Sequence, residues 1–128
     1  MIQLLQDSLI MYVNLDHRID RKERLLSEFN RVGLTQYPIE RVRGQYFEER
    51  DKSKDHTITK MLSRPQIGAI GCFTSQIKCM KKALEQGKHA FVMEDDLIFC
   101  SDFMKRMEYI DKWISGGHYD FTGMPLVS

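Results

Sequence analysis

The sequence lacks the features of membrane-spanning, secreted and nucleic-acid-binding proteins. It contains no apolar run long enough to span a membrane. It begins MIQLLQDSLIMYVNLD, without the basic and long apolar segments of a secretory signal peptide. Its 19 Lys and Arg residues nearly balance its 18 Asp and Glu residues, so its net charge favours neither nucleic acid nor an anionic membrane. We expect no transmembrane segment and no nucleic-acid partner.

Cysteine is also scarce. Cys72 and Cys79 lie seven residues apart in a predicted helix, about 10 Å along its axis, which is too far for a disulfide bond. With Cys100 they form neither a CxxC motif nor the Cys/His spacing of a zinc site. We predict three reduced, mostly buried thiols, which are typical of a reducing compartment, and we therefore expect a cytoplasmic location.

What is present suits a single domain. The 128 residues include 42% hydrophobic and 29% charged residues, which are ordinary values for a soluble globular protein. Short apolar and β-prone segments recur along the chain. They predict strands over residues 8–15, 38–42 and 89–93, and the start of a fourth strand at residues 119–121.

Helical patterns separate these strands, and we predict helices over residues 20–33, 65–87 and 101–115. Asp20 and Ser101 are expected N-caps, and Pro65 suits the first turn of the middle helix. Residues 43–64 are so charged that we predict a loop or a frayed short helix. The alternation of strands and helices predicts an α/β fold, with a mainly parallel, Rossmann-like sheet flanked by helices.

The middle helix carries two further signals. Its large apolar residues keep helical spacing and are expected to face the core, with lysines on the wet side: Ile67, Ile70, Ile77, Met80 and Leu84. Gly68 and Gly71 share nearly one face, where each costs about 1 kcal/mol relative to alanine. Either a neighbouring strand or a ligand would then approach the backbone closely. The phosphate-binding patterns GxxxxGK[ST] and GxGxxG are absent.

Three acids, Glu94, Asp95 and Asp96, end the strand predicted over residues 89–93. Side chains alternate along a strand, so Glu94 and Asp96 can share one face while Asp95 points elsewhere. Two oxygen ligands on one side suit Mg²⁺ or Mn²⁺, which commonly keep water and bind substrate phosphates. The alternative is a solvated strand end without a ligand, and the triplet alone leaves it open.

Basic residues crowd the start of the first long helix, namely Arg18, Arg21, Lys22 and Arg24. Cations at a helix N-terminus oppose the macrodipole, so this mismatch is consistent with a bound phosphate-like anion. The alternative is a set of solvated basic residues paired with neighbouring acids, namely Asp16, Asp20 and Glu23.

Taken in order, these motifs resemble glycosyltransferase family 25, the lipopolysaccharide and collagen-type glycosyltransferases. The family pattern is a strand ending in INLD with arginines after it, then GxxGCxxSH with a lysine-rich AL helix, then a strand ending in LEDD. The matching segments are VNLD at 13–16, GAIGCFTS at 68–75, KKALEQG at 81–87 and VMEDD at 92–96. Order and spacing agree over residues 9–122.

The resemblance implies a nucleotide-sugar-binding fold of the GT-A type, with residues 1–128 as one donor-binding domain that stops short of the family's usual length. It implies transfer of a hexose, galactose or glucose, from a UDP-sugar to a hydroxyl group of a glycan or protein acceptor. By the same analogy Asp96 and Glu94 would bind Mn²⁺ or Mg²⁺, with Asp95 near the ribose or the metal. The residues beside the donor would be Asn14, Arg18, Arg21 and Ser75.

Two departures from the family pattern matter. The family's SH is Ser75-Gln76 here, and glutamine can neither shuttle a proton near neutral pH nor act as an imidazole ligand. The later half of family members carries much of the acceptor site, so no catalytic base is assigned, and Asp120 is better explained as a loop or cap residue. A non-catalytic nucleotide-sugar-binding or interaction module is therefore the alternative function, and an unrelated Rossmann-like nucleotide binder is a third.

Overall fold

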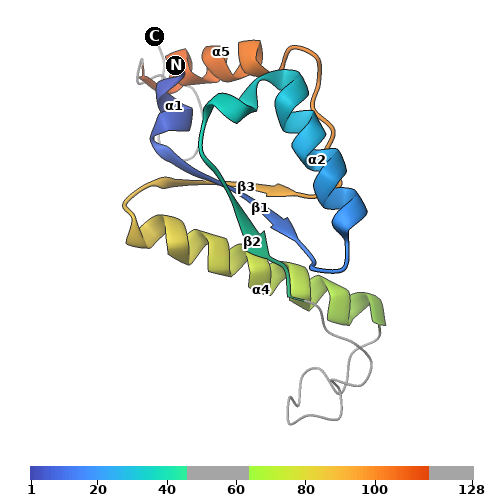
Figure 1. Ribbon diagram of the computed structural model, residues 1–128. Helices are drawn as coiled ribbons and strands as arrows, with labels where there is room; N and C mark the ends of the chain where they lie inside the picture. The colour runs from blue at the N-terminus through green and yellow to red at the C-terminus, as the bar shows by residue number, and fades with distance from the viewer. Residues whose placement is uncertain (46–63, 116–128) are drawn as a thin grey trace.

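The computed structural model describes residues 1–45 and 71–115 in full and residues 64–70 by their backbone (Figure 1). The predicted fourth strand, Asp120 and most of the predicted polar loop lie outside the described residues. The side chains of Ile67 and Ile70 and the surroundings of Gly68 also lie outside them. No helix of the described part is long and apolar enough to cross a membrane.

Within the described residues, three parallel strands form the sheet, in the order β2-β1-β3. They are β1 (Ser8–Asn14), β2 (Ile39–Arg43) and β3 (His89–Glu94). Val13 of β1 pairs with Val42 on one side and with Glu94 on the other, so all three strands end at the same edge. The prediction of an α/β fold with a parallel, Rossmann-like sheet is confirmed.

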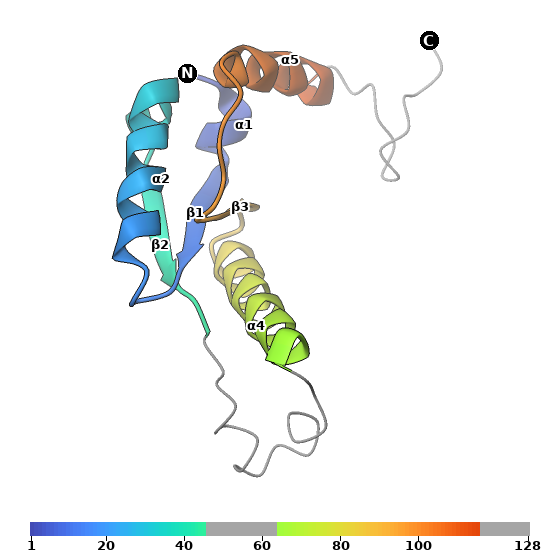
Figure 2. The same ribbon diagram turned by 90° about the vertical axis from the view of Figure 1, so that its right-hand side faces the viewer.

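Helices cover both faces of the sheet (Figure 2). α2 (Ile19–Val32) lies on one face and α4 (Arg64–Glu85) on the other. The short α1 (Gln3–Gln6) precedes β1, and a 3-10 turn, η1 (Leu34–Gln36), follows α2. α5 (Phe103–Ser115) joins the α2 side through Met107, which belongs to the same apolar cluster as the buried face of α2.

The larger part of the core lies between the sheet and α2. Alternate residues of β1, Ile10 and Tyr12, point to this side and meet Leu25 and Phe29 of α2. The Phe29 ring lies 5.7 Å from Tyr12 and 6.0 Å from Phe99, measured between centroids. These buried aromatic contacts hold α2 against the sheet.

The α4 side of the sheet is packed differently from the prediction. Cys79 and Ala83 of α4 are buried against Met11 and Val42, whereas Met80 and Leu84 are 55% and 80% exposed. The predicted core-facing row was therefore wrong for these two residues. Small side chains let the helix backbone approach the strands closely, and this fit outweighed the larger hydrophobicity of the other row.

The ends of the helices agree only partly with the prediction. Gly33 ends α2 with a positive φ of 83°, as the helix stop required. Asp20 lies in the first turn of α2, whose N-cap position is Arg18, so the Asp20 cap was wrong. α5 begins at Phe103, two residues after the expected cap at Ser101. The helix boundaries depended on loop geometry that residue preferences alone do not define.

The prediction for the cysteines had two parts, free thiols and mostly buried positions, and only the first is confirmed. All three are free thiols, as their spacing indicated. Cys79 is buried, but Cys72 and Cys100 are exposed, so the expectation of mostly buried thiols was wrong. The exposed thiol of Cys72 instead belongs to a polar cluster at the end of β3.

Replacing Phe29 by alanine should lower the free energy of unfolding by about 3–5 kcal/mol, because a fully buried ring is lost and a cavity is left. Chemical denaturation followed by circular dichroism measures this change. The matched control is Leu26→Ala on the same helix, where the side chain is 41% exposed and the loss should be much smaller. Equal losses in the two variants would contradict the packing described for α2.

Candidate functional site

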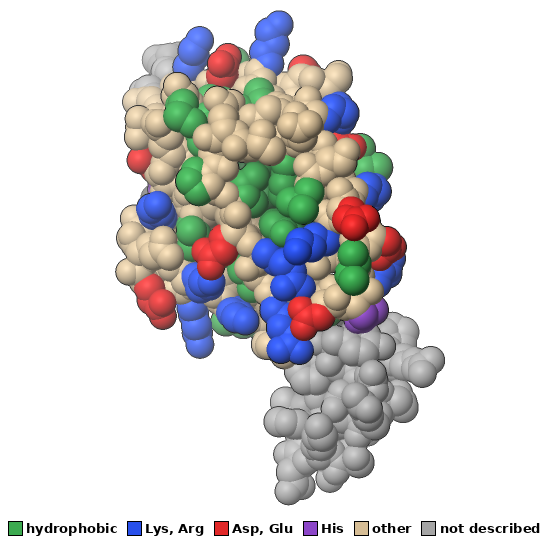
Figure 3. Space-filling view, in the orientation of Figure 1, with side chains coloured by type: hydrophobic (Ala, Val, Ile, Leu, Met, Phe, Trp, Pro, Cys, Tyr) green, Lys and Arg blue, Asp and Glu red, His purple; other side chains and the backbone are tan. Residues whose placement is uncertain are grey.

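The carboxyl ends of the three strands bring the predicted site segments together. β1 ends at Asn14, β2 at Arg43 and β3 at Glu94, at one edge of the sheet. Basic and acidic side chains gather over this edge (Figure 3). Ligands of open parallel sheets bind at this edge, so the fold places the motifs where a ligand is expected.

Asn14 connects the parts of this edge. Its side chain is only 2% exposed. Its Nδ2 donates to the Arg18 carbonyl (3.0 Å) and to Asp95 Oδ2 (2.9 Å), and its Oδ1 accepts from Arg41 Nε (3.1 Å). One amide therefore ties β1 to both neighbouring strand ends and to the turn before α2.

Arg41 was not among the residues predicted for the site. It donates to the Asn14 side chain, to the Asn14 carbonyl and to Asp16. The hydrogen bond from Arg41 Nη2 to Asp16 (2.7 Å) lowers the pKa of Asp16, and the ion pair with Arg43 adds to this effect. The available signal was its position near the end of a predicted strand, which in a parallel sheet adjoins the end of β1.

Asp95 is the inward member of the acidic triplet. Asp95 is 8% exposed, and its side chain lies on the α2 side of the sheet. Besides the bond from Asn14, it forms an ion pair with Arg21 (3.4 Å), and its carbonyl accepts from Arg24 Nη2 (3.5 Å). A carboxylate can stay this buried because donors and a guanidinium compensate it.

Glu94 and Asp96 are the outward members. Both are exposed. Glu94 Oε1 accepts from the Cys72 thiol (3.2 Å) and from Gln76 Nε2 (3.4 Å), both on α4. The bond to Glu94 is the main cause that raises the pKa of Cys72, and the Asp96 charge contributes. Glu94 thus reaches the α4 side while Asp95 points to α2, and the predicted shared face of Glu94 and Asp96 stays a prediction, because Asp96 lies in the turn after β3.

Arg18 and Asp20 form a close pair in front of α2. Arg18 Nε and Nη2 donate to the two Asp20 oxygens at 3.1 and 3.0 Å. The bond from Arg18 lowers the pKa of Asp20 to about 2 and raises the pKa of Arg18. With the Arg21–Asp95 pair, this matches the alternative in which the arginines have acidic partners, although Asp95 was not an expected partner.

Ser75 is 1% exposed and joins two segments. Its hydroxyl donates to the Gly71 carbonyl (2.9 Å), and its oxygen accepts from the Gln45 backbone N–H (2.9 Å). The chain after β2 is thereby attached to α4. Glycine suits position 44 in the same segment because any other residue would bring its Cβ to 2.9 Å from the Leu15 side chain, which is too close. The predicted contact of Ser75 with a donor stays a prediction.

The outer carboxylates are the residues that could hold a metal ion. Glu94 and Asp96 are hard oxygen ligands, as Mg²⁺ and Mn²⁺ require. Within residues 1–45 and 71–115, no group of three or more His, Cys, Asp or Glu side chains could hold a metal. The pair therefore fits a cation that one or two carboxylates bind together with water and substrate phosphates.

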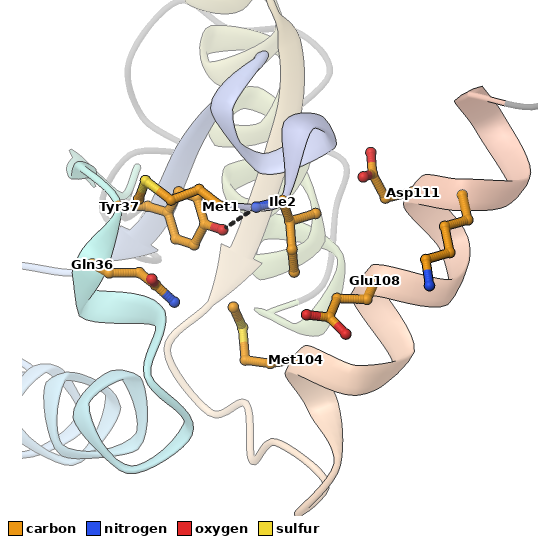
Figure 4. A pocket seen from close by; sticks show the side chains of 8 residues that line it. Met1, Ile2, Gln36, Tyr37, Met104, Glu108 and Asp111 are labelled. Atoms are coloured by element: carbon orange, nitrogen blue, oxygen red, sulfur yellow. Dashed lines mark hydrogen bonds between the residues drawn. The ribbon is translucent and has the colours of Figure 1, made fainter.

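Two of the hollows among the described residues lie mostly apart from this cluster. One, of about 450 Å³, lies between the first two residues of the chain, the end of η1 and α5, where Ile2, Tyr37 and Glu108 line it, and none of the predicted site residues lines it (Figure 4). There the Tyr37 hydroxyl accepts from the Ile2 backbone N–H at 2.8 Å. The other, about 490 Å³ and mainly apolar, runs along β3 and reaches Glu94. The polar cluster at the strand ends remains the candidate site.

Comparison with known proteins gives a family match that covers this site. The family model described as glycosyltransferase family 25 (LPS biosynthesis protein) matches residues 8–122. No curated protein and no solved structure matches the chain. The matched region contains all three strands and every predicted site residue, in agreement with the resemblance found in the motifs.

Replacing Asn14 by alanine should lower the free energy of unfolding by about 2–3 kcal/mol, because buried groups of Asp95 and Arg41 lose their partner. Thermal and chemical denaturation measure the loss. Asn30→Ala, at an exposed position of α2, is the matched control and should change little. An Asn14 variant as stable as the control would show that the strand ends do not depend on this amide.

Arg18→Ala should return the pKa of Asp20 from about 2 toward its ordinary value of 3.8, because the hydrogen bond from Arg18 is the main cause of the lowered pKa. An NMR titration of the Asp20 carboxyl measures it. Since the folded pKa is the lower one, the pair stabilises the fold above the unfolded pKa of about 3.9, and this is lost as pH falls toward 2. Arg31→Ala, which removes the partner of Glu28, should leave Asp20 unchanged.

Proposed function

The chain belongs to glycosyltransferase family 25, and from this premise we propose that it transfers a hexose, galactose or glucose, from a UDP-sugar to a hydroxyl group of a glycan or protein acceptor, with Mn²⁺ or Mg²⁺ assisting. Membership of the family supports glycosyl transfer. The donor nucleotide, the sugar, the cation, the acceptor and a fold of the GT-A type belong to the proposal.

The division of the acidic triplet carries the proposal. Asp95 has its charge compensated inside the protein by Asn14 and Arg21. Glu94 and Asp96 stay exposed beside it. If the triplet only ended a strand, none of its acids would need a buried and fully partnered position. The arrangement instead holds the Glu94 carboxylate through Cys72 and Gln76, close in sequence to the exposed Asp96, which favours a cation ligand.

The cation would be held by Glu94 and Asp96, and when bound it would neutralise charge on the diphosphate leaving group. The protein's own contribution is the placement of these carboxylates. The Asn14–Asp95 bond links β3 to β1, and the bonds from Cys72 and Gln76 orient Glu94. Pre-oriented charge of this kind requires no rearrangement when the donor binds.

Positive charge for the donor's phosphates would come from the α2 side. The Arg18 and Arg21 side chains are 35% and 40% exposed, so each can reach a ligand while keeping its acidic partner. Asn14 and Ser75 are buried and already hydrogen-bonded. We assign these two residues to positioning the strand ends, and Arg18 and Arg21 to direct contact with the nucleotide.

Gln76 favours the second candidate function, a nucleotide-sugar-binding module without transfer activity. It occupies the family's histidine position and donates to Glu94 Oε1 at 3.4 Å. An amide can orient the carboxylate but cannot exchange a proton with it near neutral pH. If the reaction needs a proton at this position, the chain would bind its donor and fail to transfer. No described residue is assigned as the base that activates the acceptor.

UDP should raise the melting temperature of the protein more with Mn²⁺ than without it, because ligand binding to the folded state stabilises it. Asp96→Asn should remove the Mn²⁺-dependent part of this increase. Differential scanning fluorimetry measures both. Asp102→Asn, at an exposed acid before α5, is the matched control and should keep the wild-type response. An unchanged response in Asp96→Asn would refute the metal role.

Turnover then separates the enzyme from the binding module. With UDP-galactose or UDP-glucose and a glycan that offers the acceptor hydroxyl, the wild type should transfer the hexose to that hydroxyl and release UDP, and Asp96→Asn should lower this rate by about 100-fold or more. UDP binding without turnover would support the binding module. Stabilisation by several nucleotides without a preference for UDP would support the unrelated nucleotide binder.

A further inference from the structure

The outward side of α4 carries an apolar stripe. Phe73, Ile77, Met80 and Leu84 follow one another at intervals of four, three and four residues, so they share one face of the helix. Phe73, Met80 and Leu84 are 64%, 55% and 80% exposed. We call these four residues the outer stripe.

The outer stripe is not a by-product of packing against the sheet. The small residues of α4 already supply the contact with the strands, through Cys79 and Ala83. Three turns of helix therefore expose large apolar side chains on the flank of α4 beside the row of Cys72 and Gln76. Phe73, Met80 and Leu84 each keep more than half of their surface exposed, so no described element covers them. Contiguous exposed apolar surface of this kind marks an interaction surface.

The charge beside the stripe identifies the kind of partner. Lys78 and Lys81 are exposed on the row next to it, and Lys88 follows the helix. Lys82 is directed elsewhere, to an ion pair with Glu40 on β2. From residue 71 to residue 84 the helix contains no acid. The border of the stripe is therefore basic although the net charge of the chain is only +1.

We propose that the outer stripe of α4 docks onto the surface of a lipid bilayer that contains anionic lipids. Phe73, Met80 and Leu84 would enter the boundary between headgroups and acyl chains, and Lys78 and Lys81 would contact the anionic headgroups. Apolar residues beside lysines on one helix are the pattern of helices that lie in this boundary. Each lysine near the surface adds to the attraction.

A second copy of the chain fits this surface less well. In a symmetric pair, the same patch meets itself, so the basic borders of the two helices would lie close together. Only Glu85 offers an opposite charge on the same row. An anionic membrane complements the border without this repulsion, and for that reason we favour it over self-association.

The docking surface lies beside the candidate site. Gln76 follows Phe73 by three residues, and its side chain contacts Glu94. Docking would hold the carboxyl edge of the sheet near the lipid surface. The proposal does not depend on which sugar is transferred or on whether transfer occurs, because it rests on α4 alone.

Vesicle sedimentation tests the proposal with the full chain. Wild-type protein should sediment with phosphatidylcholine vesicles that contain about 30 mol % phosphatidylglycerol, and much less with phosphatidylcholine alone. Binding should weaken as salt is raised. Leu84→Asp should reduce the vesicle-bound fraction at least about tenfold, because a charge replaces an inserted apolar side chain. The Lys78→Glu/Lys81→Glu variant should also bind weakly.

Matched controls are available on other helices. Leu26→Asp places the same charge at a 41% exposed position of α2, and Lys105→Glu reverses an exposed lysine on α5. Both should bind vesicles like the wild type. Leu84 is so exposed that its variant should fold normally, which circular dichroism and the melting temperature verify. The UDP response of Leu84→Asp should be unchanged, so failure of vesicle binding and failure of the donor-site proposal are distinguishable.

Two results would overturn the proposal. The first is wild-type protein that stays in solution with the anionic vesicles, or Leu84→Asp that binds them as well as the wild type does. The second is a concentration-dependent dimer, seen by analytical ultracentrifugation, that Leu84→Asp dissociates while neither protein binds vesicles. That outcome would assign the outer stripe to contact between two copies.

Discussion

The candidate site depends on one buried side-chain amide. Asn14 donates two hydrogen bonds and accepts one, and its partners lie before α2, on β2 and on β3. Among neutral side chains, only an amide offers two donors together with a carbonyl acceptor. A carboxylate there would face Asp95 at hydrogen-bonding distance and repel it, and an aliphatic side chain would leave the partners unpaired. The positions of the strand ends therefore depend on a single buried polar residue, the last one of β1.

This contact also explains why three consecutive acids differ in role. The parallel pairing of β3 with β1 places Asp95 opposite the amide, and the alternation of the strand then sends Glu94 to the α4 side. Burial of the middle carboxylate is compensated by Asn14 and Arg21. The neighbouring carboxylates of Glu94 and Asp96 stay exposed, so their oxygens remain available as ligands. A structural acid and two acids suited to a cation are thus products of the same strand register.

Three sides of α4 carry residues with different roles. Small residues approach the sheet, Cys72 and Gln76 reach Glu94, and large apolar residues face outward. The row of small residues faces the sheet because it lets the backbone of α4 lie close to the strands. The helix also joins the candidate site to the outer stripe, so that a partner of the stripe would come close to the strand ends.

The sequence by itself determined the alternation of strands and helices, the parallel sheet, the helix stop at Gly33 and the acids at the end of β3, because these follow from local periodicity and backbone preference. Tertiary structure alone decided that Asp95 is the buried acid, that Arg41 belongs to the site and that the small face of α4 meets the sheet. Each of these depends on a partner far away in the chain: Asn14 and Asp95 are 81 residues apart. Periodicity shows that a helix has an apolar row, but only the fit between two surfaces selects the row that is buried.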